Sequence, residues 1–206
     1  MPRERDEEAV LAASEAAIAL FLRRGTLRVS VAELADTSGL AHRTFYRWFA
    51  TKEQVLRPVF DWGTDEYARM LRTSPGPLHE TVERAFDHVL WGEREARTRG
   101  LFPLVFADPS AQSVFFFAIH DGEHRIVDPL AERLDLSVGD PQVRATAAAV
   151  TASLRIALED MIATGADPRP VHARALRAFA IPALSTSRAA ARGTTDQPGG
   201  QGKDTP

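Results

Sequence analysis

The chain has 206 residues, of which 44% are hydrophobic and 26% are charged, and it contains no cysteine. The length fits one large domain or two smaller ones, and the apolar fraction is sufficient for a buried core. The lack of cysteine excludes a disulfide scaffold, a cysteine-ligated zinc site and a thiol nucleophile. The N-terminus is acidic, and the first apolar run, 9–22, is too short to span a bilayer, so we expect a cytoplasmic protein with no membrane partner.

Charge is unevenly distributed along the chain. The formal net charge is −3, yet the segment from Arg23 to Arg57 holds seven Lys or Arg against three Asp or Glu, a local balance of +4. A basic segment on an acidic body indicates that one region meets an anion. Chance clustering of charge on a solvated helix face would give the same count, so charge alone leaves both interpretations open.

Helix signals dominate the N-terminal third. Apolar residues at three- and four-residue spacing predict a first helix that Gly25 ends. Ser30 and Glu33 form a capping box that opens a short second helix, which ends at Gly39, and Thr51 is expected to cap a fourth helix. The predicted second, third and fourth helices cover 31–37, 42–49 and 52–71.

Helix signals also fill the rest of the chain, after a strong breaker at Pro75-Gly76-Pro77. The further predicted helices cover 78–99, 101–106, 109–134, 142–164 and 170–183. The fold class is therefore all-α with about nine helices. We expect a helix-turn-helix domain over 1–56, a connecting helix over 52–71, a C-terminal helical domain over 72–184, and a disordered tail over 185–206 that has little to bury.

Ser38-Gly39-Leu40 separates two short helices in the manner of a helix-turn-helix, where glycine permits the tight turn. Leu40 and Phe45 are expected to fill the angle between them. The side chains left outward on the second of these helices are hydrogen-bond donors able to reach phosphates and base edges, namely His42, Arg43, Thr44, Tyr46 and Arg47. The pattern therefore favours DNA binding, although such patterns also arise by chance in helical proteins.

The segment from Glu8 to Leu56 resembles the N-terminal domain of TetR-type (TetR/AcrR) transcriptional regulators. The residues that carry the resemblance are Arg24-Gly25, Ser30 to Ala35, Ser38 to Leu40, Thr44 to Phe49 and Thr51 to Glu53. The resemblance implies a dimeric DNA-binding protein, most simply a repressor that a small-molecule effector releases from a palindromic operator, with no cofactor. It implies phosphate contacts for Ser30, Tyr46, Arg47 and Lys52, and base contacts for His42, Arg43 and Thr44.

Three positions depart from the family pattern. Ala41 stands at the N-cap of the recognition helix, where Ser or Thr is common, and alanine cannot accept the free amide hydrogen bond there. Arg43 stands where glycine is frequent and could add a contact to guanine. Thr26 replaces the aromatic residue that usually follows Gly25, so Leu27 or Val29 is expected to fill that packing role.

The second domain raises the question of the effector. Five phenylalanines lie within 102–117, and they are consistent either with a plain core or with an apolar pocket that holds a few polar anchors. The candidate pocket residues are Trp62, His88, Trp91, Phe102, Phe106, Gln112, Phe116, His120, Arg155 and Glu159. The end of the chain also resembles the mycofactocin-type branch of the family, which implies a large acyl-type effector.

Other functions of the C-terminal domain are weaker alternatives. His120 and His124 have the i, i+4 spacing of a zinc or nickel pair, but Gly122 weakens the helix and no third ligand is placed by the sequence, so we assign no metal. No nucleophile motif or phosphate loop is present, so we predict no enzyme activity and no catalytic residue. The alternative function is a helical ligand- or metal-binding protein, or an enzyme, with its site in this domain.

The expected homodimer depends on the last two predicted helices, 142–164 and 170–183, whose apolar stripes suit an isologous four-helix interface. Leu158 and Phe179 are the expected interface residues. The connecting helix 52–71 starts beside the DNA-binding helices and ends beside the second domain. Its tilt is therefore expected to change the spacing of the two recognition helices in a dimer.

Overall fold

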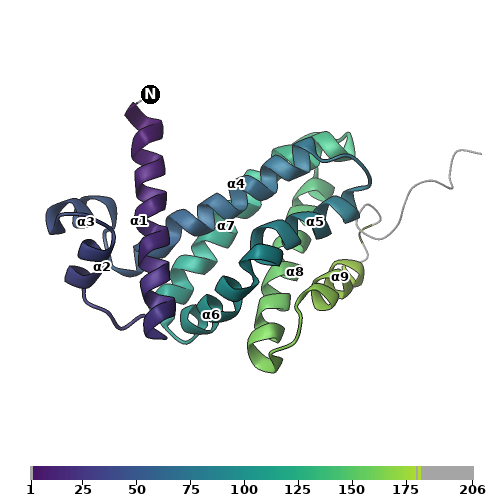
Figure 1. Cartoon of the computed structure of the whole chain (residues 1–206). Coiled ribbons are helices and arrows are strands. Elements are labelled where there is room, and N and C mark those ends of the chain that lie inside the picture. Colours follow the sequence, from purple (N-terminus) through teal and green to yellow (C-terminus); the bar gives the residue numbers. More distant parts are fainter. Residues whose placement is uncertain (1, 180, 182–206) are drawn as a thin grey trace, which may run out of the picture.

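A computed structural model describes residues 2–179 and 181. Over these residues it contains nine α-helices, two short 3-10 helices and no strand, so the predicted all-α fold is confirmed (Figure 1). The α-helices are α1 (Pro2–Arg24), α2 (Val31–Thr37), α3 (His42–Trp48), α4 (Arg57–Thr73), α5 (Leu78–Leu90), α6 (Glu95–Phe106), α7 (Pro109–Leu134), α8 (Pro141–Thr164) and α9 (Arg169–Ala178). The 3-10 helices are η1 (Glu53–Leu56) and η2 (Gly92–Arg94).

Helices α1, α2 and α3 pack around a small core of their own. Phe45 and Phe49 are buried, with ring centroids 5.0 Å apart. Two serine hydroxyls tie α1 to its neighbours: Ser14 Oγ donates to the Val55 carbonyl at 2.5 Å, and Ser38 Oγ donates to the Ala13 carbonyl at 3.1 Å. Packing and these two hydrogen bonds therefore hold the helix-turn-helix and η1 against α1, and the bond from Ser14 is buried.

The turn between α2 and α3 has the predicted geometry. Gly39 adopts a φ of +64°, a conformation that other residues rarely adopt. Ser30 Oγ accepts the Glu33 N–H at 3.2 Å, as the capping box predicts. The Glu33 carboxylate, however, accepts a hydrogen bond from Arg24 Nε at 3.0 Å, so it braces α1 against α2. Ala41 provides no side-chain cap for α3, as expected.

The predicted helix over 52–71 is wrong at its start. Thr51 does not cap it; instead the 3-10 turn η1 follows, and α4 begins only at Arg57 and runs on to Thr73. Pro58 explains the restart, because proline lacks an N–H and suits the first turn of a helix rather than its interior. The third predicted helix is also one residue shorter than expected and ends at Trp48.

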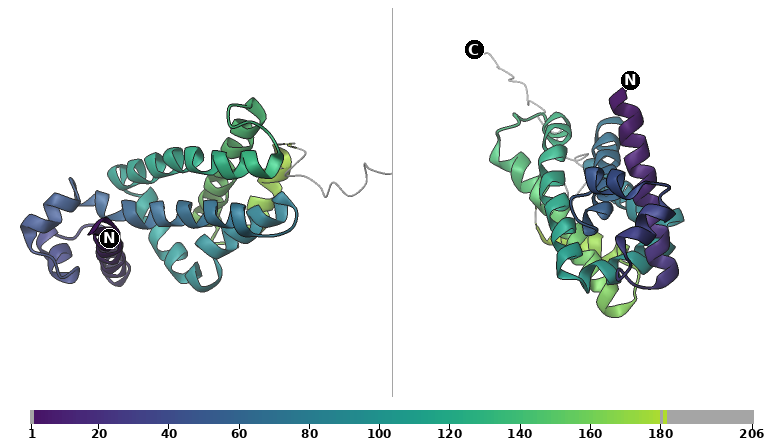
Figure 2. Two further views of the ribbon diagram at one scale, coloured as in Figure 1. Left: turned by 90° about the horizontal axis from the view of Figure 1, so that it is seen from above. Right: turned by 90° about the vertical axis from the view of Figure 1, so that its left-hand side faces the viewer.

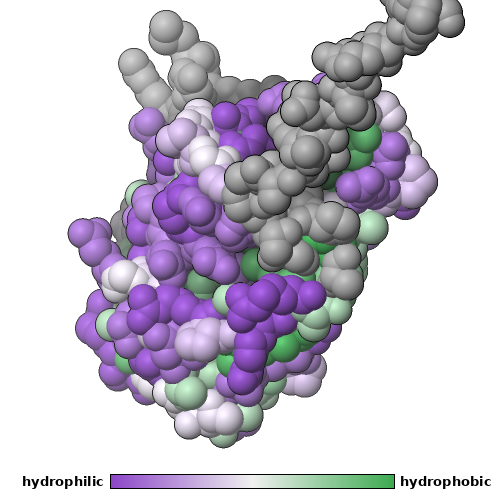
Figure 3. Space-filling view, turned by 90° about the vertical axis from the view of Figure 1, so that its right-hand side faces the viewer, coloured by the Kyte–Doolittle hydropathy of each residue, from purple (hydrophilic) through white to green (hydrophobic). Residues whose placement is uncertain are grey.

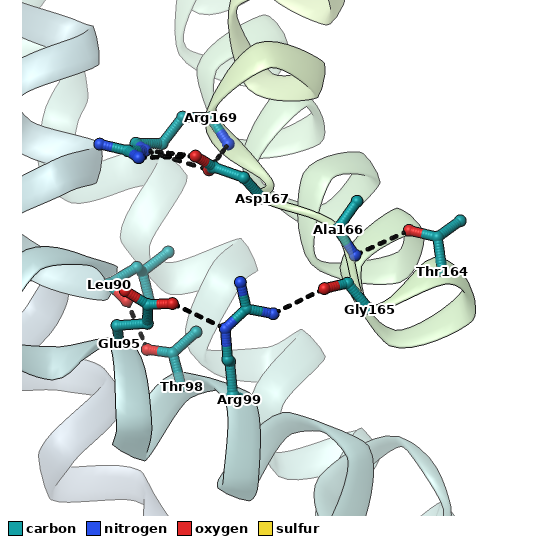
Figure 4. Close-up of polar contacts among 9 residues, drawn as sticks. All are labelled: Leu90, Glu95, Thr98, Arg99, Thr164, Gly165, Ala166, Asp167 and Arg169. Atoms are coloured by element: carbon teal, nitrogen blue, oxygen red, sulfur yellow. Dashed lines mark hydrogen bonds and ion pairs between the residues drawn. The ribbon is translucent and has the colours of Figure 1, made fainter.

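The predicted boundary between the helices over 78–99 and 101–106 is also wrong. Helix α5 ends at Leu90, Trp91 is extended and buried, and α6 then runs from Glu95 through Pro103 to Phe106 as one helix. Gly92 makes the turn with a φ of +57°. Thr98 Oγ1 donates to the Leu90 carbonyl at 2.5 Å and so secures the end of α5 (Figure 4).

Helices α7 and α8 start where a proline follows an aspartate cap. Asp108 accepts N–H groups at the start of α7, and Asp140 accepts one at the start of α8. Helix α7 continues unbroken past Gly122 to Leu134, and α8 ends at Thr164, both as predicted. Helix α9 ends at Ala178 rather than at Ala183. Residues 180, 182 and 183 of that prediction and the whole predicted tail, 185–206, lie outside the described residues.

Helices α4 and α7 run side by side along the length of the molecule and join its two ends (Figures 1 and 2). Helix α8 packs on α7 and α9, and α9 also contacts α5. Arg133 of α7 donates to the carbonyls of Ser74 and Gly76, at 2.6 and 2.7 Å, and so fixes the turn after α4. Arg99 of α6 bridges Glu95 and the Gly165 carbonyl, which ties α6 to the end of α8 (Figure 4).

The end of the molecule that lies opposite α2 and α3 is mostly hydrophilic in the space-filling view, with apolar residues beside the atoms drawn in grey (Figure 3). Within the described part of the chain, no single helix is both long and apolar enough to cross a membrane. By length and composition alone, the pair Leu78–Phe106 and Pro109–Leu134 would pass together, but it is bent by 116°.

Candidate functional site

The outer face of α3 carries polar and basic side chains that are exposed to solvent. His42, Arg43, Tyr46 and Arg47 are exposed, and Tyr46 is 56% exposed. Arg43 and Arg47 make no hydrogen bond or ion pair with any described residue. Buried Phe45 on the opposite face anchors the helix. These side chains are therefore free to meet an anionic partner.

Ser30, Thr44 and Lys52 are more constrained than the residues on that face. Ser30 Oγ is engaged as the cap of α2, and Thr44 is half-buried. Lys52 Nζ donates to the Leu27 carbonyl at 3.3 Å and lies 3.8 Å from Glu53 Oε1. The ammonium group is thus fixed beside the loop between α1 and α2. Arg28 in this loop is exposed, and it was counted in the basic segment but not singled out by the sequence.

A network of ion pairs joins α4 to α7 close to the helix-turn-helix. Arg57 contacts Asp61 at 2.9 Å and Asp121 of α7 at 2.6 Å. Arg125 of α7 contacts Asp61 and Asp65, each at 3.1 Å. The hydrogen bond from Arg57 lowers the pKa of Asp121. The network fixes how α4 sits along α7, just after the segment that leads out of α3.

A cavity of about 80 Å³ lies among α4, α5, α6, α7 and α8. Its lining is mainly apolar and includes Val59, Phe60, Trp62, Leu101, Phe102, Phe115, Ile119, Ile126, Val150 and Leu154. Two glycines in its wall allow close helix packing. A Cβ on Gly122 would lie 2.9 Å from Thr64 Oγ1, and one on Gly63 would lie 3.0 Å from Val89 Cγ1. At Gly122, α7 therefore lies so close to Thr64 of α4 that a larger side chain would clash.

The hydroxyl groups that line the cavity are already satisfied by the protein. Tyr67 donates to the Val82 carbonyl at 3.0 Å, and burial raises the pKa of this phenol. Thr64, Thr98 and Thr151 each donate to a carbonyl of their own or a neighbouring helix. Arg97 differs from all of these, because it has no hydrogen bond or ion pair with any described residue. Burial lowers the pKa of its guanidinium.

Of the ten pocket candidates named from the sequence, Trp62 and Phe102 line the cavity. The other eight lie outside it: His88, Trp91, Phe106, Gln112, Phe116, His120, Arg155 and Glu159. Burial and helical spacing could not separate these two groups, because a residue can be buried or aromatic without facing this gap. The polar residues of the cavity wall, Arg97 above all, were missed; Arg97 lies in a stretch rich in Arg and Glu that reads as a solvated face.

Several of the outlying candidates have evident structural contacts. His88 Nε2 lies 2.9 Å from Glu66 Oε1 on the surface. The Trp91 ring is buried with the Arg99 guanidinium 4.7 Å from its centroid. Arg155 and Glu159 pair with each other at 2.7 Å.

Aromatic candidates on α6 and α7 gather beside the cavity. The Phe106 ring meets Phe115 at 5.5 Å and Phe116 at 6.1 Å between centroids. Phe115 is buried and lines the cavity, whereas Phe116 and Phe117 are 40% and 66% exposed. The three adjacent phenylalanines therefore face different surroundings, as their helical spacing requires.

His120 and His124 lie next to each other on α7, with ring centroids 4.8 Å apart. His124 Nδ1 is 2.9 Å from the His120 carbonyl, and the intervening Asp121 is engaged by Arg57. The structure groups no three His, Asp or Glu residues as metal ligands within the residues that it describes.

Comparison with known proteins identifies the N-terminal part of the chain. Residues 14–59 match the family model described as "Bacterial regulatory proteins, tetR family". A repressor of Mycolicibacterium smegmatis, KstR2, is 35% identical over 80 residues, which cover 37% of each chain. A repressor of Mycobacterium tuberculosis, Rv3405c, is 36% identical over 87 residues, which cover 42% of this chain and 45% of the relative. The matched part thus spans less than half the length of these curated relatives.

Solved structures match the fold over most of the chain. A tetR-family regulator from Streptomyces coelicolor has a TM-score of 0.53 at 17% identity and covers 84% of this chain and 82% of its own. FadR from Bacillus subtilis, solved with stearoyl-CoA, has a TM-score of 0.54 at 13% identity. The match covers 82% of this chain and 96% of the FadR chain. Residues 14–59 therefore match the N-terminal domain of this family, and the described chain has an all-helical fold similar to that of these solved structures.

Proposed function

We propose that this protein is a ligand-responsive, DNA-binding transcriptional regulator, most simply a repressor that a small-molecule effector releases from its operator. The observation that carries the proposal is the outer face of α3, where basic and polar side chains stand exposed and unpaired inside the matched domain. The names of the relatives, KstR2 and Rv3405c, describe transcriptional repressors and support a regulatory rather than a catalytic role.

The contacts to DNA divide by position. His42, Arg43 and Thr44 lie at the start of α3 and are proposed to read base edges in the major groove. The proposed phosphate contacts are Ser30, Tyr46, Arg47 and Lys52. We add Arg28, because it is exposed in the loop that Lys52 contacts. Phosphate contacts fix register and orientation, whereas base contacts supply the sequence preference.

The proposed division into domains follows from these roles. Residues 1–56 bind DNA, α4 connects, and 72–184 hold the effector and the dimer interface. The cavity is bounded by both α4 and α7, and these are the helices that the Arg57 and Arg125 ion pairs join. An effector whose buried part exceeds about 80 Å³ must displace part of the cavity wall, and we propose that α4 moves relative to α7. Such an effector favours the moved state and thereby shifts the spacing of the two recognition helices.

A palindromic operator and a homodimer belong to the same proposal. One short recognition helix reads only a few base pairs, and two-fold symmetry doubles the contacts. Helices α8 and α9 are proposed as the interface. The proposed location is the cytoplasm, where the DNA lies. The resemblance to the mycofactocin-type branch stays a prediction about the effector.

The test is selection of bound duplexes from a random pool by the full chain, followed by sequencing. The proposal predicts an enriched inverted repeat whose half-sites lie about one helical turn apart. An Arg43→Ala/Arg47→Ala double variant with an unchanged melting temperature serves as the control and is expected to enrich nothing. Recovery of a random pool by the unmodified protein would contradict the proposal.

A further inference from the structure

Arg97 stands out among the residues around the cavity because its charge has no partner. The hydroxyl groups of Tyr67, Thr64, Thr98 and Thr151 all bond to carbonyl groups of the protein. Arg97 is half-buried, lines the same cavity and contacts no described carboxylate within ion-pair distance. A guanidinium is always protonated, so a positive charge remains at the wall of an apolar space.

Burial and a neighbouring cation both disfavour the charge of Arg97, and one exposed acid offsets part of this effect. Arg94 lies one turn earlier on the chain, and its charge opposes that of Arg97. The Arg94 guanidinium is 4.5 Å from the centroid of the Trp62 ring, and Trp62 itself lines the cavity. Glu15 of α1 is the one acid whose charge favours the Arg97 cation, but it is exposed and makes no ion pair with it.

Partly buried cations are stabilised by a bound anion more than exposed ones are, because less water screens the pair. The guanidinium fork matches the two oxygens of a carboxylate. The rest of the cavity wall is apolar, and its hydroxyls have no free donor to offer. The chemistry of the cavity therefore favours a ligand with one anionic end and an apolar body.

We propose that the cavity binds a small hydrophobic carboxylate, whose apolar body lies among Phe102, Phe115 and Ile126 and whose carboxylate pairs with Arg97. This inference rests on the proposed function in that it assigns the chemical class of the effector. Helix α6, which carries Arg97, also packs against α1. Gly100, one turn further along α6, abuts Leu22 of α1, so α6 and α1 are in direct contact.

Calorimetric titration of the full chain with butanoate, hexanoate and octanoate, and with the matching primary alcohols, tests the inference. At least one carboxylate is expected to bind about tenfold or more tightly than its alcohol. Arg97→Met should abolish that preference while the alcohol binds as before, and Arg97→Lys should retain part of it. Arg72→Met is the matched control, because Arg72 is exposed at the far end of α4 and lies outside the cavity.

Two results would overturn the inference: no carboxylate preferred over its alcohol, or an unchanged preference in Arg97→Met. Melting curves of each variant confirm that it is folded, and Arg97→Lys provides a second reading if Arg97→Met is unstable. DNA binding by the same samples is measured separately. Carboxylate binding without any DNA binding would contradict the proposed function alone, whereas DNA binding without a carboxylate preference would contradict this inference alone.

Discussion

At the scale of single residues, Arg43 and Lys52 test the proposed division between base contacts and phosphate contacts. Arg43 is exposed and unpaired at the start of α3, whereas Lys52 is fixed by the Leu27 carbonyl beside the loop before α2. Arg43→Ala is expected to cost about 1–3 kcal/mol of binding free energy per contact and to relax the preference at one symmetric pair of positions. Lys52→Ala should weaken all duplexes alike and lower the salt slope by about one per protomer.

Affinities for the selected operator and a scrambled duplex, at two salt concentrations, distinguish these outcomes. Equal loss on both duplexes in Arg43→Ala would make Arg43 a phosphate contact, and base reading would then fall to His42 and Thr44.

His172 in α9 makes the stability of the protein depend on pH. Its ring stacks on Phe86 with centroids 4.2 Å apart, its Nε2 is buried without a hydrogen bond, and burial lowers its pKa to about 3. The unfolded chain, with a pKa of about 6.5, binds this proton more readily at acidic pH. The contribution of His172 to the free energy of unfolding is therefore full above pH 6.5 and falls by about 2 kcal/mol between pH 8 and pH 5.

Denaturant unfolding of His172→Phe at both pH values measures this term, because phenylalanine keeps the ring and removes the titration. The variant should lose less stability on acidification than the unmodified protein. His124→Gln, at an exposed position, should lose as much as the unmodified protein. An unchanged pH dependence in His172→Phe would assign the effect to other groups.

The amino-acid sequence predicted which residues of α3 are exposed better than it predicted which residues line the cavity. The exposed residues of α3 could be read from the spacing of Phe45 and Phe49 on its buried side. The cavity instead depends on how five helices pack together. The spacing of residues within one helix does not predict this packing. Trp62 and Phe102 were therefore found among ten candidates, while Arg97, in a charged stretch, was not.

At the scale of elements, helix ends with local signals were predicted well, and breaks caused by packing were not. Ser30, Gly39 and Gly165 set the ends of α2 and α8 as expected. The break after Leu90 depends on Trp91, which is buried. The sequence marks this break only by Gly92, and a single glycine is a weak signal for a helix end. The start of α4 depends on Pro58, which was read as interior to a longer helix.

The contact between α4 and α7 offers a direct test of the proposed signal. A Cβ on Gly122 would lie 3.6 Å from the Thr64 Cβ, within the range that a disulfide requires. Because the chain has no cysteine, Thr64→Cys/Gly122→Cys would form a single, defined crosslink. Oxidation should hold α4 against α7, so that effector no longer changes operator affinity, and reduction should restore the response.

Each single-cysteine variant is the control for this crosslink, because it changes the cavity wall without joining the helices. Effector binding is measured by calorimetry in both redox states. If the oxidised protein still binds effector and still releases DNA, the signal does not depend on movement of α4 against α7.

At the scale of the whole molecule, the proposed dimer requires a different probe from the one that the sequence offered. Leu158 is fully buried within one protomer, so Leu158→Asp would unfold α8 rather than separate subunits. Phe179, at the end of α9, is 42% exposed, and Ile156 is half-buried on α8. Ile156→Glu/Phe179→Asp is expected to give a folded monomer with weak operator binding.

Sedimentation and operator affinity check this expectation. Val138→Asp is the matched control, since Val138 is 52% exposed between α7 and α8 and lies outside the proposed interface. A double variant that remains dimeric and binds its operator normally would place the interface elsewhere.

The central claim is that exposed basic residues of α3 make this chain a sequence-specific DNA-binding protein. The most direct measurement is the equilibrium affinity of the full chain for the selected operator and for a scrambled duplex over a series of salt concentrations. We expect the operator to bind at least about 10³-fold more tightly than the scrambled duplex, and the logarithm of its affinity to fall linearly with the logarithm of salt concentration. Equal affinity for the two duplexes, or an affinity that salt does not change, would contradict it.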